Sequence, residues 1–279
     1  MRNVLIALKD RGEAARLAAA AAALVGTGAR VDVTHVAVTI SDRDLAEADG
    51  AVAAAVGELR ARGIAAHGHV DTMGEWGVAR RLVERARASA AEAVVMGSRG
   101  LQSVGGLVAG SVSHALLASL QLPVLVLPDG ADAPAHGLRR VLVAVGSEDD
   151  AGAAAAAVRL LPGPVTELLA VHVPRRVALH AGEAVANPFL EIGETSTAVL
   201  ATALGHFQAA GLHIGTRTVG RDGGVAAAIC DSAREWDADL IVLGPRRPGA
   251  WKALVAGSAS HGVLHHSDRP VLIVARSAR

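Results

Sequence analysis

Aromatic residues, cysteine and an excess of charge are all scarce or missing in this sequence. Its 279 residues include no Tyr, 2 Phe and 3 Trp, which nearly excludes aromatic stacking platforms for single-stranded nucleic acid. The 27 Lys and Arg are balanced by 27 Asp and Glu, so no basic surface favours DNA, RNA or an anionic membrane. We therefore expect neither a nucleic-acid partner nor a membrane partner.

Long apolar segments and paired cysteines are missing as well. The apolar run 4–8 is followed at once by charge, and the Ala-rich run 14–25 is too short to span a bilayer. The single cysteine, Cys230, excludes an internal disulfide and fits a reducing compartment. We predict that Cys230 is a small buried residue of an amphipathic helix and that the protein is cytoplasmic.

The sequence consists of two copies of one unit. Three pairs of segments match at a constant distance of 147 residues, as between Gly97 and Gly244: 94–97 with 241–244, 109–114 with 256–261, and 122–126 with 269–273. The copies open alike at 4–8 and 141–145, where the distance is 137 residues. The second copy therefore holds about ten extra residues, which we place around 174–195. One long period of this kind indicates a duplicated domain rather than a solenoid.

Each copy alternates strand patterns with helix patterns. Strands are predicted at 3–8, 30–37, 64–71, 93–97 and 123–127, and again at 140–145, 165–173, 212–220, 239–244 and 270–275. Because these runs lack clear polar alternation, we expect strands that are covered on both faces. Strand–helix alternation predicts parallel sheets with right-handed crossovers. The predicted fold class is α/β, with two tandem, doubly wound domains of five parallel strands each, 1–128 and 139–279, joined by a linker at 129–138.

The segment 97–113 carries the most specific motif in the chain. It contains Gly97-Ser98-Arg99-Gly100, nine further residues and Gly110-Ser111-Val112-Ser113, between a predicted strand and a predicted helix. Glycine lets the backbone leave the strand in conformations that a Cβ would oppose, and it leaves room for a phosphate held by free N–H groups. Ser111 or Ser113 can cap the helix, and Arg99 can add a charge-assisted contact. A surface loop before a capped helix is the alternative interpretation.

The spacing Gly97-x2-Gly100-x9-Gly110-Ser111 is similar to the nucleotide-binding motif of the universal stress protein family. The order of the five strands and the opening 141–145 of the second copy also resemble that family, over nearly the whole chain. The resemblance implies a tandem universal stress protein with strand order 3-2-1-4-5 in each domain. In ATP-binding members this segment wraps the phosphates and the ribose. That role would fall on Gly97, Gly100, Gly110, Ser111, Val112 and Ser113, with Arg99 beside them.

The base side of such a site would come from the ends of the first two strands. The segment Thr34-His35-Val36 resembles the family's His-Val segment beside the base, which points to Val36. The family usually has an Asp directly after strand one. Here Lys9 stands in that place, after Leu8 and before Asp10, and in the second copy Val145 runs straight into Gly146, as though the Asp were deleted.

The second copy carries an altered loop. Arg247 stands where the second glycine of the motif belongs, and an Arg cannot cheaply adopt a positive φ and would crowd the phosphate space. We therefore expect the 244–260 loop to bind nucleotide poorly or not at all. The alternative is that Arg246 and Arg247 bind a phosphate by charge.

The leading hypothesis is a stress-response or regulatory protein that binds ATP, or another adenine nucleotide, in its first domain, with Mg²⁺ as a candidate accompanying ion. No general base is evident, so hydrolysis would be slow at most. The alternative is a nucleotide-free scaffold with the same fold. An ATP-dependent ligase is a third candidate, but its S-G-G-x-D-S signature is missing.

The remaining polar clusters receive structural interpretations. We interpret His261, His265 and His266 as helix-surface residues rather than metal ligands, and we predict no metal site. We interpret the acidic pair 149–150 as an N-terminal charge effect on the first helix of the second copy. The resemblance implies that the last strands of the two copies pair within the chain, and that chains can form a homodimer.

Overall fold

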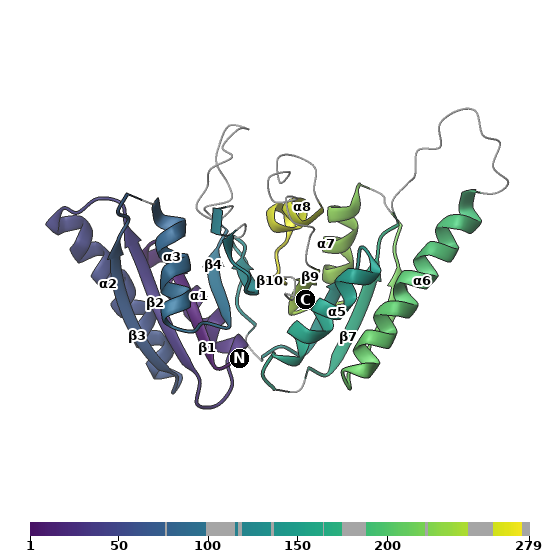
Figure 1. Ribbon diagram of the computed structural model, residues 1–279, viewed down its shortest axis with the longest axis horizontal. Helices are drawn as coiled ribbons and strands as arrows, with labels where there is room; N and C mark the ends of the chain where they lie inside the picture. The colour runs from purple at the N-terminus through teal and green to yellow at the C-terminus, as the bar shows by residue number, and fades with distance from the viewer. Residues whose placement is uncertain are drawn as a thin grey trace.

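One continuous ten-stranded sheet runs through the protein (Figure 1). The structure is a computed structural model that describes residues 1–75, 77–98, 115–116, 119–134, 137–163, 165–174, 188–220, 223–244 and 259–274. The first copy contains β1 (Asn3–Leu8), η1 (Arg11–Glu13), α1 (Ala14–Leu24), β2 (Arg30–Ala37), α2 (Asp42–Ala61), β3 (Ala65–Thr72), α3 (Gly77–Ala88), β4 (Ala93–Gly97) and β5 (Val124–Leu127). The second copy contains β6 (Arg140–Ala144), α5 (Glu148–Arg159), β7 (Glu167–His172), α6 (Pro188–Ala209), β8 (Gly215–Thr218), α7 (Val225–Glu235), β9 (Leu240–Leu243), α8 (Ala259–His266) and β10 (Val271–Ile273).

The strand order confirms the predicted topology. The sheet reads β3-β2-β1-β4-β5-β10-β9-β6-β7-β8, so each copy has the order 3-2-1-4-5. Neighbouring strands are parallel within each copy, and the two copies meet through the antiparallel pair β5–β10, with Leu125 opposite Leu272. The predicted pairing of the last strands within the chain is therefore present.

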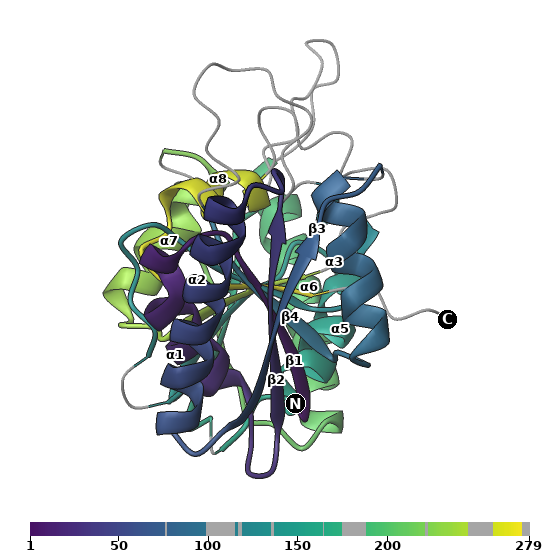
Figure 2. The same cartoon turned by 90° about the vertical axis from the view of Figure 1, so that its left-hand side faces the viewer.

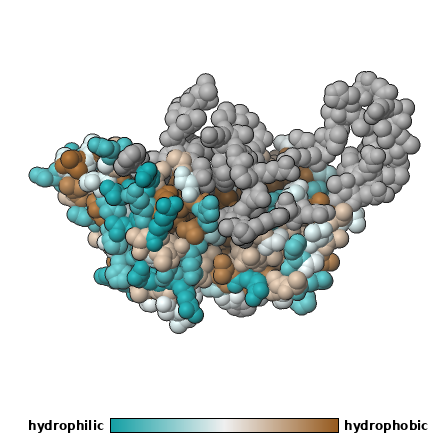
Figure 3. Space-filling view, in the orientation of Figure 1, coloured by the Kyte–Doolittle hydropathy of each residue, from teal (hydrophilic) through white to brown (hydrophobic). Residues whose placement is uncertain are grey.

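Two apolar layers hold the helices against the sheet. One layer contains buried residues of α1, α2, α5 and α6, and the other contains buried residues of α3, α7 and α8. Figure 2 shows α1 and α2 on one side of the first copy's strands and α3 on the other. Along α3, Leu82, Val83 and Ala86 are buried while Arg80 and Arg87 are exposed, and Figure 3 shows hydrophilic residues gathered over this part of the surface.

Burial differs between the inner strands and the two outermost strands. The four residues of β4 before Gly97 and all of β9 are buried, as expected for strands that are covered on both faces. The expectation is wrong for β3, where only Ala66 is buried, and for β8, where every residue is exposed. These two strands end the sheet, so each pairs with a neighbour on one side only.

The extra residues of the second copy lie between its second strand and the next helix. In the first copy β2 ends at Ala37 and α2 begins at Asp42, whereas β7 ends at His172 and α6 begins at Pro188. Residues 175–187 lie outside the described residues. No described helix is both long enough and apolar enough to cross a bilayer.

The start of the linker is fastened to the first copy. Arg16 of α1 donates hydrogen bonds to the carbonyl oxygens of Pro128 (2.6 Å) and Ala131 (2.7 Å). The backbone N–H of Asp129 donates to the buried Ser98 hydroxyl at 2.9 Å. The chain that leaves β5 is thereby tied to the residue that follows β4.

Candidate functional site

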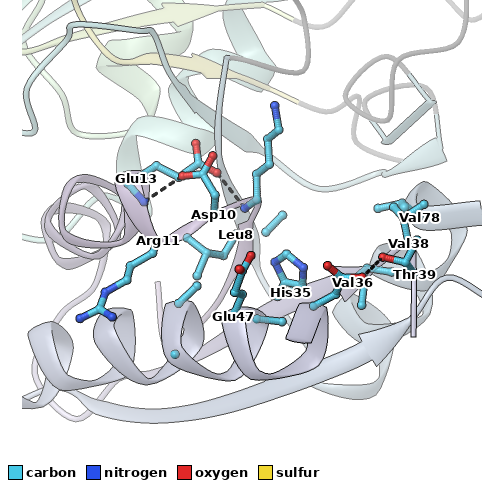
Figure 4. A pocket seen from close by; sticks show the side chains of 18 of the residues that line it. Leu8, Asp10, Arg11, Glu13, His35, Val36, Val38, Thr39, Glu47 and Val78 are labelled. Atoms are coloured by element: carbon cyan, nitrogen blue, oxygen red, sulfur yellow. Dashed lines mark hydrogen bonds between the residues drawn. The ribbon is translucent and has the colours of Figure 1, made fainter. Parts of the chain in front are cut away.

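A large pocket opens at the carboxyl ends of the first copy's strands. Strand β1 lies between β2 and β4, and the chain order of the sheet reverses there, which is where doubly wound sheets hold ligands. The pocket has a volume of about 1190 Å³, enough for a ligand of nucleotide size. Figure 4 shows Asp10 and Glu13 at one end of it and Val38, Thr39 and Val78 at the other.

The structure brings together all the described members of the predicted site. Leu8, Lys9, Asp10, Val36 and Gly97 all line this one pocket. The remaining predicted contacts lie outside the described residues: Arg99, Gly100, Gly110, Ser111, Val112 and Ser113. Arg246 and Arg247 of the second loop lie outside them as well.

A buried carboxylate organises the turn after β1. Glu13 is only 3% exposed, and its Oε1 accepts the backbone N–H of Lys9 at 2.7 Å. Asp10 caps the short helix η1 by accepting the N–H of Gly12 at 2.8 Å. The turn is therefore held by two carboxylates, of which Glu13 was not predicted as a site residue.

Gly97 lies close to the carboxylate of Glu13. A Cβ built on Gly97 would collide with Oε2 of Glu13, and the Glu13 Cδ atom would lie 3.3 Å from it. Gly97 has no positive φ, so the expected conformational reason for this glycine is wrong. The first glycine of the motif leaves room for a buried carboxylate of its own domain.

The second copy repeats this arrangement. The N–H of Gly146 donates to Oδ2 of Asp150 at 3.2 Å, and a Cβ on Gly244 would collide with the Cβ of Asp150. Glu13 and Asp150 are 137 residues apart, as are Lys9 and Gly146. The interpretation of Asp150 as a simple helix-terminus charge is therefore incomplete. The two turns also match in length, so Lys9 and Gly146 hold the same place after the first strand of their copies. Neither of these residues is acidic.

The two copies differ at the histidine of the His-Val segment. In the second copy His172 is buried, and its Nδ1 lies 2.8 Å from the carbonyl oxygen of Val145, a bond in which Nδ1 donates. Its counterpart His35 lines the first-copy pocket, and within the described part of the chain its buried Nδ1 has no hydrogen-bond partner. The first copy thus retains unused hydrogen-bonding capacity beside the pocket.

The far rim of the pocket comes from the start of α2. Ser41 caps the helix by accepting the N–H of Asp44 at 3.1 Å, and the hydroxyls of Ser41 and Thr39 donate to the Asp44 carboxylate. These two hydrogen bonds lower the pKa of Asp44 below its usual 3.8. Sequence reasoning missed this rim, although the Ser41-x-x-Asp44 spacing is a recognisable helix-start signal.

The lining suits binding better than nucleophilic chemistry. Leu8, Val36 and Met96 offer an apolar wall, whereas the charged side chains of Lys9 and Arg43 stand at the exposed edge. Among the described residues, no three His, Cys, Asp or Glu side chains are placed to hold a metal ion. Such a pocket can take a flat apolar ring inside and polar substituents toward the opening.

Strand order and layering define a doubly wound α/β fold that is present twice in one chain, and the first copy has a pocket at the point where its strand order reverses. The family model described as the Universal stress protein family matches residues 1–128 and, a second time, residues 137–275. The chain belongs to the universal stress protein family and carries its domain in tandem.

Two solved structures share this fold, and one curated protein matches part of the sequence. A universal stress protein from Archaeoglobus fulgidus DSM 4304 has a similar solved structure, with a TM-score of 0.67 and 19% identity over 99% of this chain and 96% of its own. A putative universal stress protein from Pseudomonas aeruginosa UCBPP-PA14 gives a TM-score of 0.59 and 16% identity over 98% and 93%. Universal stress protein Sll1654 of Synechocystis sp. is 44% identical over 61 residues, which are 22% of this chain and 39% of that protein.

Proposed function

We propose that this universal stress protein is a cytoplasmic regulatory protein that binds an adenine nucleotide, ATP, in the first-copy pocket. The observation that carries the proposal is the convergence of Leu8, Lys9, Asp10, Val36 and Gly97 on one pocket at the point where strand order reverses. Those residues come from three separate strand ends, and each was expected at the site from the motif and the family resemblance.

The described lining supports the base side of such a ligand, and the phosphate side rests on the motif that begins at Gly97. The adenine ring would lie against the apolar wall of Leu8, Val36 and Met96. The phosphates would extend toward Gly97 and the loop that begins there, whose motif carries the phosphate contacts. Mg²⁺ bound to the phosphates would neutralise part of their charge.

We propose that the second copy contributes structure rather than a second binding site. Its loop has Arg247 in place of a glycine. In addition, Nδ1 of His172 already donates a hydrogen bond to the carbonyl oxygen of Val145. In this proposal ATP is a regulatory ligand, and the protein hydrolyses it slowly at most. We also propose that two chains associate as a homodimer.

The rival function is a nucleotide-free scaffold. The observation that favours it is that neither copy has an acidic residue directly after its first strand, where the family resemblance leads us to expect one. A scaffold would use the tandem fold to present surfaces to a protein partner.

A matched pair of variants separates the two functions. We expect Gly110→Trp to abolish ATP binding by the intact chain, measured by calorimetry, because the bulky side chain occupies phosphate space. The control Gly257→Trp makes the same change in the second copy and should leave binding intact. Circular dichroism checks that both variants fold. An intact wild-type chain that binds no ATP at millimolar concentration contradicts the proposal and favours the scaffold.

A further inference from the structure

We infer that Lys9 is a modification site of the first-copy pocket: its amine takes the acyl group of an acyl adenylate that is bound there. An acyl adenylate is a mixed anhydride in which an acyl group is attached to the phosphate of AMP. The inference rests on the proposed function, because it names a reactive class of adenine nucleotide for the same pocket. It gives Lys9 a chemical role that the glycine motif does not contain.

Lysine is rare in this chain. The 27 Lys and Arg residues include two lysines, Lys9 and Lys252, and Lys252 lies outside the described residues. Arginine does not lose its proton in proteins, so it offers no nucleophilic nitrogen, whereas a lysine amine does. Lys9 lines the described pocket and therefore brings a residue type with amine chemistry to it.

The backbone of Lys9 is held beside Gly97. The β1–β4 register pairs Ala7 with Met96. Lys9 and Gly97 follow these two residues closely in the chain, at the carboxyl ends of neighbouring strands. Glu13 joins the two places, since its Oε1 accepts the N–H of Lys9 at 2.7 Å and its Oε2 packs on Gly97. The flexible four-carbon side chain of Lys9 thus starts from a fixed point at the pocket.

The amine of Lys9 is free to react. Lys9 is exposed, and within the described part of the chain no carboxylate pairs with its side chain. Arg43, by contrast, pairs with Glu47 at 3.0 Å. The hydroxyl of Thr39, another lining residue, donates to the Asp44 carboxylate. No such contact has to break before Lys9 attacks a ligand.

The apolar wall of the pocket brings the donor to Lys9. In the proposed function the adenine ring lies against Leu8, Val36 and Met96. Lys9 directly follows Leu8, so we expect a nucleotide with its ring on this wall to place its ribose and single phosphate near the Lys9 side chain. Two groups that are held together in this way react faster than the same groups in free solution. The second copy has Gly146 at the matching place and therefore lacks the amine.

The step is an acyl transfer without oxidation or reduction. The neutral amine attacks the carbonyl carbon of the acyl group, a C–N bond forms, and the C–O bond to the phosphate breaks. AMP leaves with the electron pair of that bond, and the proton of the amine goes to water. The amide that results no longer carries the cation of Lys9 at the pocket edge. Exposure to an acyl adenylate is thereby converted into a lasting change of charge.

The experiment incubates the intact chain with acetyl adenylate at mildly alkaline pH and follows acetylation of each lysine by peptide mass spectrometry. Lys252 is the control within the same molecule, and acetyl phosphate is the control donor, which carries the same acyl group without adenosine. We expect the ratio of the Lys9 rate to the Lys252 rate to be about tenfold higher with acetyl adenylate than with acetyl phosphate. Excess ATP should slow acetylation of Lys9 and leave that of Lys252 unchanged. Lys9→Arg keeps the charge and should lose the fast-reacting site.

Equal ratios for the two donors would overturn the inference, because they show that the pocket does not direct the reaction. Failure of ATP to protect Lys9 would overturn it as well. Calorimetry with ATP and AMP on the same preparation separates this inference from the proposed function. A chain that binds either nucleotide but gives equal ratios loses the inference alone. A chain that binds neither fails the proposed function, and the inference falls with it.

Discussion

Substitution of Gly97 by Ala tests whether the first glycine of the motif serves the domain's own buried carboxylate. The new Cβ would collide with Oε2 of Glu13 and lie 3.3 Å from its Cδ, so the carboxylate must move and release the N–H of Lys9. Overpacking typically costs about 1–3 kcal/mol, and a lost hydrogen bond to a charged group costs about 1.5–3 kcal/mol. We expect the free energy of unfolding to fall by about 2–4 kcal/mol.

A double-mutant cycle gives the decisive comparison. Glu13→Ala removes the three atoms nearest to the new Cβ, so Gly97→Ala should cost about 1–3 kcal/mol less in that background. In the second copy the Cβ on Gly244 would meet the Cβ of Asp150 and also its Cα, at 3.2 Å. Because Asp150→Ala keeps both atoms, Gly244→Ala should show little relief there.

Urea unfolding followed by circular dichroism measures the four single variants and the two double variants. Hydrogen exchange of the β4 and β9 amides assigns each change to its copy. Equal relief in the two copies, or none in the first, would refute the account of Gly97.

Three further predictions concern the described structure outside this contact. Arg16→Ala should speed amide exchange at 129–131 and lower the unfolding free energy by about 1–3 kcal/mol, because the carbonyl oxygens of Pro128 and Ala131 each lose the Arg16 donor and, among the described residues, Pro128 keeps only the N–H of Ala131. Burial raises the pKa of the Cys230 thiol to about 11, so a thiol reagent at pH 8 should react with the folded protein far more slowly than with the urea-unfolded chain. The hydroxyls of Ser41 and Thr39 lower the pKa of Asp44, so its stabilising effect is complete above pH 3.8 and is lost as the pH falls through the lower folded value. The carboxyl carbon in an NMR titration should show a midpoint below 3.8, and Ser41→Ala should move that midpoint upward.

Much of the fold could be predicted because the sequence repeats itself. Matching segments such as 94–97 and 241–244 lie at equal places in the two halves of the sheet, and strand–helix alternation leaves few topologies open. The exposure of β3 and β8 does not follow from the repeat or from the strand pattern of their own residues. It follows from the strand order 3-2-1-4-5, which the family resemblance implied and which places the third strand of each copy at an end of the sheet.

Some residues of the candidate site could be predicted from the sequence and others could not. Gly97 was predicted because the glycine motif is a local pattern, and Val36 because its His-Val segment resembles that of the family; both line the pocket. Glu13 escaped prediction because its contact with Gly97 joins residues on different elements, far apart in the chain. A comparison of the copies at the 137-residue distance would have shown an acidic residue at both 13 and 150, which was the available signal.

Native mass spectrometry of the intact chain with Mg²⁺ and ATP is the most direct test of the central claim. The account predicts one nucleotide per chain, lost in Gly110→Trp and retained in Gly257→Trp. Two equivalent nucleotides per chain would contradict the asymmetry between the copies, and none at millimolar ATP would contradict nucleotide binding altogether.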